Sequence, residues 1–321
     1  MPTRLVVWAR IQPELLLEEA RRQLGGGAVL ASSVAEMAAA LRDGAEMLVL
    51  SDAAYTAEAA AALRDHAREL RWIQCVTTGT DRMQRFGVPP GVIVSNVGDA
   101  FAPAVATHAV ALLLALQRRL PRTMDAQAAR HWDREVAMGA CIPLGQCAVV
   151  LGFGPIGQEI ARLLLAFGMQ VTAVSRSGAP HALVPVLPAD RLDDALAEAD
   201  ALVLAAPLTA ETALIIDAPR LARCKPGLLL VNIGRGGLVD QPALATALRE
   251  GLVGGAALDV AEPEPLPADD PLWQAPNLII TPHVAGLAAG VSMRRICDVL
   301  GDNLRHILAG RDPAHVVLRG A

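Results

Sequence analysis

Short apolar runs alternate with helical patterns along most of the chain. In the N-terminal third, five such runs are typical of buried strands: 5–9, 28–32, 47–51, 72–76 and 92–95. Between the first of them lie two helical segments, PELLLEEARRQL before Gly25–Gly27 and SVAEMAAALRD, in which Ser33 and Glu36 match a capping box. Strands that alternate with helices in this way indicate a parallel sheet covered on both faces.

The same pattern starts again after a long apolar helix near 103–119. Further apolar runs predict strands at 147–151, 170–174, 201–206, 227–232, 255–259 and 277–281. These runs are almost continuously apolar, as expected in a doubly wound sheet. An irregular segment from Pro121 to Pro143 precedes the second set of strands, and a helical stretch at 291–310 closes the chain. We therefore expect two α/β units linked by the helix near 103–119.

Composition is consistent with a compact protein of this organisation. The chain has 321 residues, of which 53% are apolar and 19% charged, enough for two domains. The net charge of −5 argues against a nucleic-acid partner, which would favour a basic surface. The apolar stretch 100–116 is interrupted by Pro103 and His108, so a buried helix is a better interpretation than a membrane span. His108 itself is interpreted as a packing residue or as part of a polar interface.

The cysteines and the N-terminus bear on location. The five cysteines are scattered without CxxC spacing, which favours reduced thiols over disulfides or a metal site. The apolar run in MPTRLVVWAR is too short for a signal peptide. We expect a cytoplasmic protein without a membrane partner or a metal ion.

A glycine loop follows the first strand of the second unit. In LGFGPIGQEIARLLLAFG, the glycines Gly152, Gly154 and Gly157 have GxGxxG spacing, directly after a strand and at the start of an apolar helix. In this context they permit a tight turn, a close approach of backbone to a pyrophosphate, and close helix–strand packing. The helix N-terminus adds N–H groups and the positive end of a dipole. The loop therefore predicts a dinucleotide site.

Three later segments place polar side chains just beyond strand ends, where open α/β sheets bind ligands. They are VNIGRGGLVD with Arg235, LDVAEPEPLP with Asp259 and Glu264, and IITPHVAG with His283. An arginine flanked by glycines suits bidentate binding of a carboxylate. A histidine beside a carboxylate can serve as an acid or base near neutral pH.

Together these motifs resemble the D-isomer-specific 2-hydroxyacid dehydrogenase family. The similarity is nearly continuous from Ala199 to Gly286 and includes APLTAET, KPGLLLVNIGRGGLVD, GAALDVAEPEPLPADDPLW and NLIITPHVAG. It implies an α/β fold of two doubly wound parallel-sheet domains, one flavodoxin-like and one Rossmann, with the active site in the cleft. Residues 1–98 and 286–321 would form the substrate domain, and 99–285 the NAD(P)-binding domain.

The resemblance also assigns a catalytic trio. Arg235 would grip the carboxylate of a 2-oxo acid and polarise its carbonyl. His283 would donate a proton to the carbonyl oxygen as hydride arrives, and accept it in the reverse reaction. Glu264, the second glutamate of AEPEP, would hydrogen-bond His283 and keep it protonated. Glu262 is interpreted as a solvated loop charge.

Further residues are implied as binding groups. For the cofactor they are Gly152, Gly154, Pro155, Ile156, Gly157, Ser175, Arg176, Ser177, Pro207, Thr212, Ile233 and Asp259. For the substrate they are Arg235, His283 and the loop CVTTGTD with Thr77, Thr78 and Gly79, the loop acting through its main chain. The segment AVATHAV departs from the family pattern, because Thr107 stands where a glutamate is more common.

The stretch AVSRSGAP bears on the choice of cofactor. An acidic residue is expected about twenty residues beyond the glycines, where it bonds the adenosine ribose. Here Ser175, Arg176 and Ser177 occupy that position. Hydroxyl donors and a guanidinium suit a 2′-phosphate, so we expect NADP(H) to be preferred and NAD(H) to remain possible. The alternative is a solvent-facing Arg176 and an enzyme indifferent to the phosphate.

Several functions remain open from the sequence. The first is reduction of a small 2-oxo acid, glyoxylate or hydroxypyruvate, to the D-2-hydroxy acid. A D-lactate- or phosphoglycerate-type dehydrogenase would keep the same trio, although Arg82 and Arg85 alone do not indicate a phosphate subsite. A non-catalytic, cofactor-sensing corepressor-like protein is the third. The resemblance further implies a homodimer built around the linking helix and the cofactor domains.

Overall fold

The computed structural model describes residues 4–288 and 290–320, and the chain forms two compact units. One unit comprises Met1–Phe101 with Ala288–Ala321, and the other comprises Ala102–Leu287. These limits lie two or three residues from the expected boundaries. In the described part of the chain, no helix is long and apolar enough to cross a membrane.

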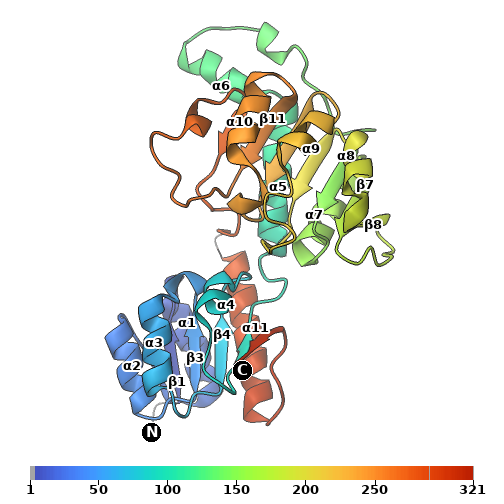
Figure 1. Cartoon of the computed structure of the whole chain (residues 1–321). Helices are drawn as coiled ribbons and strands as arrows, with labels where there is room; N and C mark the ends of the chain where they lie inside the picture. The colour runs from blue at the N-terminus through green and yellow to red at the C-terminus, as the bar shows by residue number, and fades with distance from the viewer. Residues whose placement is uncertain (1–3, 289, 321) are drawn as a thin grey trace. The chain divides into compact units, whose positions relative to one another are not determined.

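The first unit contains a sheet of six strands in the order β13-β5-β4-β3-β1-β2 (Figure 1). The strands are β1 (Leu5–Trp8), β2 (Ala28–Leu30), β3 (Met47–Leu50), β4 (Trp72–Cys75), β5 (Ile93–Ser95) and β13 (Val316–Arg319). β13 pairs antiparallel with β5, and the other pairs are parallel. The order of the parallel strands reverses at β1, as in flavodoxin-like sheets. The predicted flavodoxin-like unit is confirmed.

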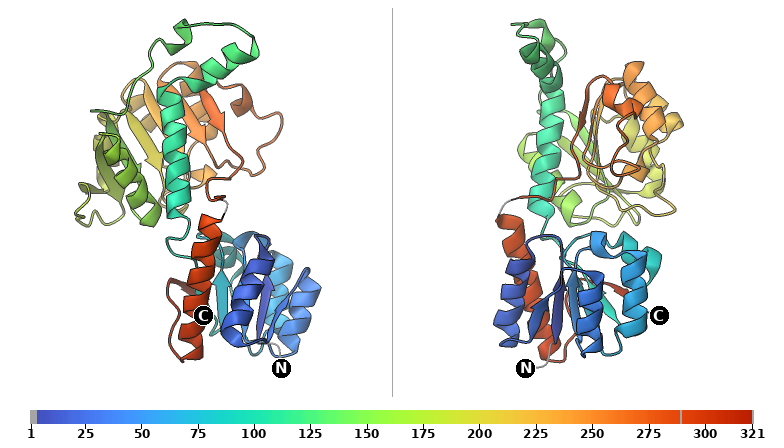
Figure 2. Two further views of the ribbon diagram at one scale, coloured as in Figure 1. Left: turned by 180° about the vertical axis from the view of Figure 1, so that it is seen from behind. Right: turned by 90° about the vertical axis from the view of Figure 1, so that its left-hand side faces the viewer.

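Helices cover both faces of this sheet. α1 (Pro13–Leu24) and α11 (Val291–Leu308) pack together on one face, and α2 (Val34–Arg42) and α3 (Ala57–His66) on the other (Figure 2). The short α4 (Asp81–Phe86) follows β4. Each face has its own apolar core. Leu16, Leu300 and Leu304 belong to the first, and Met37, Leu41 and Leu63 to the second.

The second unit contains a fully parallel sheet of seven strands in the order β12-β11-β10-β9-β6-β7-β8. The strands are β6 (Cys147–Leu151), β7 (Gln170–Ser175), β8 (Val186–Pro188), β9 (Ala201–Leu204), β10 (Leu228–Asn232), β11 (Val253–Leu258) and β12 (Leu278–Ile280). β6 lies between β7 and β9, so the strand order reverses beside β6. Ligands of such sheets bind beyond the carboxyl ends of the strands at this point. The sheet confirms the predicted Rossmann unit.

Helices also cover the second sheet on both faces. α5 (Ala102–Gln117) and α7 (Pro155–Ala166) pack together, while α8 (Leu192–Ala197), α9 (Ala218–Arg223) and α10 (Gln241–Arg249) lie on the opposite face. Leu112 and Leu113 of α5 are buried, so the apolar stretch is a packed helix. α6 (Leu120–Ala128) follows α5 and buries none of its side chains.

Three sequence-based expectations need correction. The segment after Pro121 is not wholly irregular, since Pro121 lies in the first turn of α6, where proline is tolerated. The last element is not a helix, because β13 follows α11. The short strand β8 was also missing from the predicted strands. The capping box is also different. Ser33 Oγ accepts a hydrogen bond from the Glu36 amide, as expected. The Glu36 carboxylate, however, accepts from the amide and hydroxyl of Ser32 and not from the Ser33 amide.

Candidate active site

The glycine loop joins β6 to α7 at the point where the strand order reverses. Gly152 has φ +95°, and a Cβ there would lie 2.5 Å from the Ala206 amide nitrogen in the loop after β9. A Cβ on Gly157 would lie 2.0 Å from the Gly152 oxygen. Two of the three glycines are therefore required by the close approach of backbone segments.

Gly154, the middle glycine of the motif, faces open space. A Cβ on Gly154 would have no heavy atom within 4 Å, and Gly154 caps α7 without a side-chain hydrogen bond. Pro155 occupies the first turn and Ile156 follows it. A side chain at 154 would therefore meet no protein atom but would fill the space in front of the helix N-terminus. These residues fit the pyrophosphate of a dinucleotide.

The predicted ribose-recognition segment lies at the end of β7. Ser175 Oγ accepts a hydrogen bond from the Gly178 amide at 3.2 Å, and Ser177 Oγ accepts one from the Ala179 amide at 3.3 Å. Because each hydroxyl accepts from main chain, its own proton remains available to donate. Arg176 lies exposed between them. The segment is thus a turn of donors with a guanidinium at its surface.

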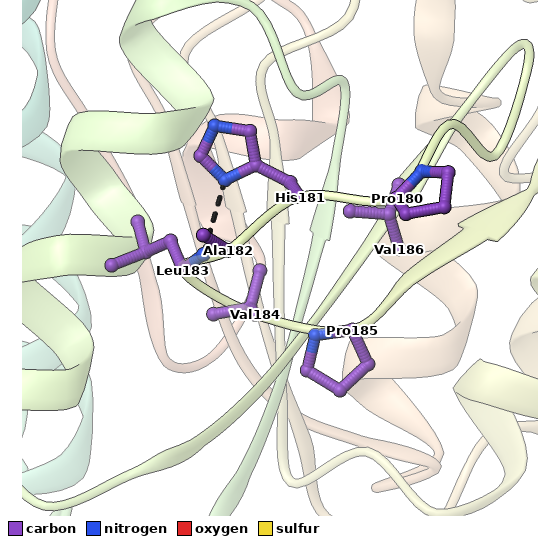
Figure 3. A pocket seen from close by; sticks show the side chains of 7 residues that line it. All are labelled: Pro180, His181, Ala182, Leu183, Val184, Pro185 and Val186. Carbon is purple, nitrogen blue, oxygen red and sulfur yellow. Dashed lines mark hydrogen bonds between the residues drawn. The ribbon is translucent and has the colours of Figure 1, made fainter.

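The chain between this turn and β8 lies against the glycine loop. The ring of His181 packs edge-on to Phe153, with ring centroids 5.1 Å apart. Figure 3 shows His181 accepting a hydrogen bond from the Leu183 amide at Nδ1, in a pocket lined by 180–186. None of the predicted catalytic side chains lines this pocket.

The loop after β9 is folded on itself. Thr212 Oγ1 donates to the Pro207 oxygen at 2.7 Å and accepts from the Thr209 amide at 2.8 Å. Thr209 in turn donates to Glu211, and this hydrogen bond lowers the pKa of Glu211, with a smaller contribution from the charge of Arg176. Pro207 and Thr212 thus lie in one ordered loop. Glu211 of the same loop interacts electrostatically with Arg176.

The arginine loop follows β10. Buried Asn232 accepts from the Gly234 amide and donates to the Arg235 oxygen, which wraps the start of the loop. Ile233, between Asn232 and Gly234, is buried. A Cβ on Gly236 would lie 2.1 Å from the carbonyl carbon of Ala261. Gly236 therefore allows the Arg235 loop to abut the segment that carries Glu264.

Glu264 and His283 meet across two strand-end segments. His283 Nδ1 lies 2.9 Å from Glu264 Oε2, and Glu264 Oε1 accepts from the Ala261 amide. A carboxylate only accepts, so the imidazole donates through Nδ1 and its Nε2 is left for another partner. This is the arrangement of an acid or base oriented by a carboxylate.

Electrostatics tie the three predicted catalytic side chains together. The hydrogen bond to Glu264 raises the pKa of His283 above its usual value, while partial burial and the charge of Arg235 oppose the rise. Burial acts to raise the pKa of Glu264, but the hydrogen bond and charge of His283 outweigh it and lower that pKa. The pair therefore favours an imidazolium beside a carboxylate.

Gln241 is a site residue that the sequence did not indicate. Its side chain, 8% exposed at the start of α10, donates to the Glu262 oxygen and accepts from the Glu262 amide, both at 2.8 Å. Glu262 itself is held through its main chain, which agrees with its interpretation as a solvated charge. Gln241 thereby fixes the segment that presents Glu264. A glutamine at a helix start has no recognisable signature, because its partner lies in a different loop.

Asp259, the remaining predicted cofactor residue of the second unit, is buried. The Asp259 side chain is 1% exposed and accepts hydrogen bonds from the segment around His283, so its observed contacts are with protein. Among residues 4–288 and 290–320, no three His, Cys, Asp or Glu side chains gather as a metal site would require.

The predicted substrate loop lies in the other unit, after β4. Thr77 Oγ1 donates to the Gly79 oxygen and accepts from the Asp52 amide, and the Thr78 oxygen accepts from Asn96. The side chain of Thr77 is thus engaged within the protein, in agreement with a loop that would act through its main chain.

Comparison with known proteins identifies relatives over about two thirds of the chain. Residues 110–285 match a family model described as D-isomer specific 2-hydroxyacid dehydrogenase, NAD binding domain. Over 225 residues the chain is 40% identical to a D-3-phosphoglycerate dehydrogenase of Mycobacterium bovis, and the match covers 68% of this chain but 41% of that enzyme. Over 235 residues it is 36% identical to a glyoxylate reductase of Thermococcus kodakarensis, covering 71% of this chain and 70% of the relative.

Solved structures extend the similarity to both units. A D-isomer specific 2-hydroxyacid dehydrogenase family protein from Aeromonas salmonicida has a TM-score of 0.85 and 31% identity, over 99% of each chain. An NADPH-dependent glyoxylate/hydroxypyruvate reductase from Sinorhizobium meliloti has a TM-score of 0.78 and 29% identity, over 98% of this chain and 97% of that one. The glycine loop, the Glu264–His283 pair and these matches agree, and the chain belongs to the D-isomer specific 2-hydroxyacid dehydrogenase family.

Proposed function

We propose that the protein is an oxidoreductase that reduces a small 2-oxo acid to the D-2-hydroxy acid with a nicotinamide cofactor. The observation that carries the proposal is the hydrogen bond between His283 Nδ1 and Glu264, with Arg235 acting electrostatically on both. A bound nicotinamide supplies hydride to the carbonyl carbon. The chain then has to supply a proton and to hold the acid in place.

The proposed division of labour follows from the chemistry of the three side chains. His283, protonated on both nitrogens, donates the Nε2 proton to the carbonyl oxygen. Glu264 accepts the Nδ1 hydrogen bond and stabilises the imidazolium before transfer. Arg235 binds the substrate carboxylate and polarises the carbonyl, since a guanidinium presents paired donors to a carboxylate. We further propose Thr77, Thr78 and Gly79 as substrate-binding residues that act through their main-chain N–H groups.

For the substrate, we propose glyoxylate or hydroxypyruvate. Relatives named glyoxylate reductase and glyoxylate/hydroxypyruvate reductase support this choice. A D-3-phosphoglycerate dehydrogenase among the relatives supports the alternative of a phosphorylated substrate, and a D-lactate-type enzyme would use the same trio.

We propose NADP(H) as the preferred cofactor, with NAD(H) as a weaker one. Two hydroxyls whose oxygens already accept main-chain bonds can donate to a 2′-phosphate, and exposed Arg176 adds a positive charge. The absence of a carboxylate at residues 175–177 removes the usual repulsion of that phosphate.

A non-catalytic cofactor sensor of the corepressor type would keep the same side chains, so turnover is the discriminating test. We propose to follow NADPH oxidation with a panel of 2-oxo acids that includes glyoxylate, hydroxypyruvate, pyruvate and phosphohydroxypyruvate. The expected result is turnover, highest with the first two acids. Folded protein that binds NADPH but reduces none of the acids in the panel would leave the sensor as the better explanation.

We also propose a homodimer in the cytoplasm. The support for a dimer is the segment around α6, where several apolar side chains are exposed, among them Met124, Trp132 (94% exposed) and Met138. All five cysteines are free, which suits a reducing compartment. Sedimentation of the wild type and of Trp132→Glu tests the dimer, which we expect the substitution to weaken.

A further inference from the structure

Asp259 restrains the segment that carries His283. The Asp259 main-chain oxygen accepts from the His283 amide at 2.7 Å. Its buried carboxylate accepts from the next two amides, Val284 at Oδ1 (2.9 Å) and Ala285 at Oδ2 (3.0 Å). Three consecutive amides thus point at one residue at the end of β11.

The restraint is applied where the backbone needs it. His283 has φ +53°, a left-handed conformation that a residue with a side chain adopts only when its surroundings impose it. The orientation of this residue decides whether its ring meets Glu264. The position of the imidazole therefore depends on the hydrogen bonds that Asp259 makes to the segment.

The side chain of Thr281 also donates a hydrogen bond to the Asp259 carboxylate. Thr281 Oγ1 donates to Asp259 Oδ1 at 2.6 Å. A hydroxyl has a single proton, so the Thr281 oxygen can only accept from any further partner. That partner is His108 of α5, whose Nε2 lies 3.1 Å from Thr281 Oγ1 and 3.4 Å from Asp259 Oδ1. His108 must therefore carry a proton on Nε2 and donate it to Thr281.

The result is a chain of hydrogen bonds from one layer of the unit to another. It begins on α5, which packs on the sheet, passes through Thr281 at the end of β12, and ends on the amides beside His283. His108 is separated from Thr281 by 173 positions in the sequence. Of the two interpretations from the sequence, packing or a polar interface, these contacts favour the polar one for His108.

We propose that His108 and Thr281 are positioning residues, which act through Asp259 to hold His283 in the geometry that pairs it with Glu264. Neither residue is proposed to touch the reacting atoms. The inference rests on the proposed role of His283 as the proton donor. It adds two residues outside the trio that hold His283 in position.

The experiment compares pairs of variants that keep or lose the hydrogen bond. His108→Gln retains an N–H donor and His108→Leu does not, while Thr281→Ser retains the hydroxyl and Thr281→Val does not. We expect the Leu and Val variants to lower kcat about tenfold or more, because misplacement of a catalytic group is costly. The KM for NADPH should stay within about twofold, since the glycine loop is untouched. The Gln and Ser variants should recover most of the activity.

Amide hydrogen exchange gives a readout that does not depend on turnover. Exchange of the Val284 and Ala285 amides should be faster in His108→Leu and Thr281→Val than in the wild type, with the rest of the sheet unchanged. His66→Leu and Thr246→Val are matched controls. His66 belongs to the other unit, and exposed Thr246 makes its observed hydrogen bonds to Pro242 and Arg249 of its own helix.

Two results would overturn the inference. One is wild-type kcat and wild-type protection of these amides in His108→Leu. The other is equal impairment of His108→Gln and His108→Leu, which would assign the effect to packing. If His283→Gln keeps full turnover, the proposed function fails instead, and the exchange experiment still decides whether the hydrogen-bond chain orders the segment.

Discussion

The imidazole Nδ1 of His283 lies 2.9 Å from Oε2 of Glu264, and the two residues come from segments beyond different strands, β12 and β11. The hydrogen bond raises the pKa of His283 above 6.5, and the pKa of Glu264 is lowered despite its partial burial. This single contact fixes the direction of several expected effects.

The first expected effect is on the pH dependence of Glu264→Gln. In the proposed mechanism reduction requires a protonated His283, so the rate is full below the pKa of His283 and falls as the pH rises through it. Removing the carboxylate removes the main cause of the raised pKa. The alkaline limb of kcat/KM for reduction should therefore move to lower pH in Glu264→Gln, and the limb for oxidation should move the same way.

The control is Glu262→Gln, in the same loop, where the observed hydrogen bonds involve only the main chain of Glu262. Its profile should match the wild type. Superimposable alkaline limbs for Glu264→Gln and the wild type would mean that Glu264 does not set the protonation of His283.

A second expectation concerns the two glycines after Arg235. A Cβ on Gly236 would lie 2.1 Å from main chain at Ala261, whereas a Cβ on Gly237 would lie 3.1 Å from the flexible side chain of Leu208. Gly236→Ala should cost about 3 kcal/mol of unfolding free energy, as backbone shifts in overpacked sites do, and should reduce turnover by separating Arg235 from Glu264. Gly237→Ala should be close to wild type. Chemical denaturation and steady-state kinetics measure both, and similar stability losses would contradict the assignment.

Gln241 provides a third expectation. Gln241→Ala leaves the amide and oxygen of Glu262 without their partner, which typically costs about 1–3 kcal/mol when the groups are buried. We expect lower kcat with little change in the KM for NADPH, because Glu264 loses its support while the glycine loop keeps its shape. Gln170→Ala, exposed at the start of β7, is the comparison. A normal kcat in Gln241→Ala would show that the loop holds itself.

The cofactor preference gives the fourth expectation. Arg176→Ala should raise the KM for NADPH about tenfold or more, because hydrogen bonds to charged groups contribute about 1.5–3 kcal/mol, and should leave the KM for NADH almost unchanged. Glu211→Gln should act in the opposite direction, since the charge of Glu211 interacts with that of Arg176. Equal changes with both cofactors in Arg176→Ala would remove Arg176 from phosphate recognition.

These residues also show which parts of the site and the fold could be predicted from the sequence. Arg235 and His283 could be predicted as polar side chains because each follows a strand in a visible motif, and the resemblance to the family selected Glu264 over Glu262. The two sheets could be predicted for the same reason, since buried parallel strands are nearly continuous apolar runs. β8 and β13 could not. β8 has three residues and ends in a proline, and β13 pairs antiparallel at an edge.

The supporting residues were beyond sequence reasoning for a different reason. Gln241 and His108 act through contacts with segments far away in the chain, and nothing in their neighbours indicates those partners. Asp259 was predicted as a cofactor residue from the resemblance, while its observed contacts are with the segment around His283. Its approach to a nicotinamide stays a prediction.

The most direct test of the whole account is the turnover of His283→Gln. Glutamine keeps a polar side chain of similar size but cannot donate a proton as an acid. With NADPH and glyoxylate or hydroxypyruvate, kcat should fall by about 10²–10⁴-fold, the usual contribution of a general acid. NADPH binding, followed by fluorescence, and the melting temperature should stay near those of the wild type. Turnover close to that of the wild type would contradict the account, because another group would then have to supply the proton.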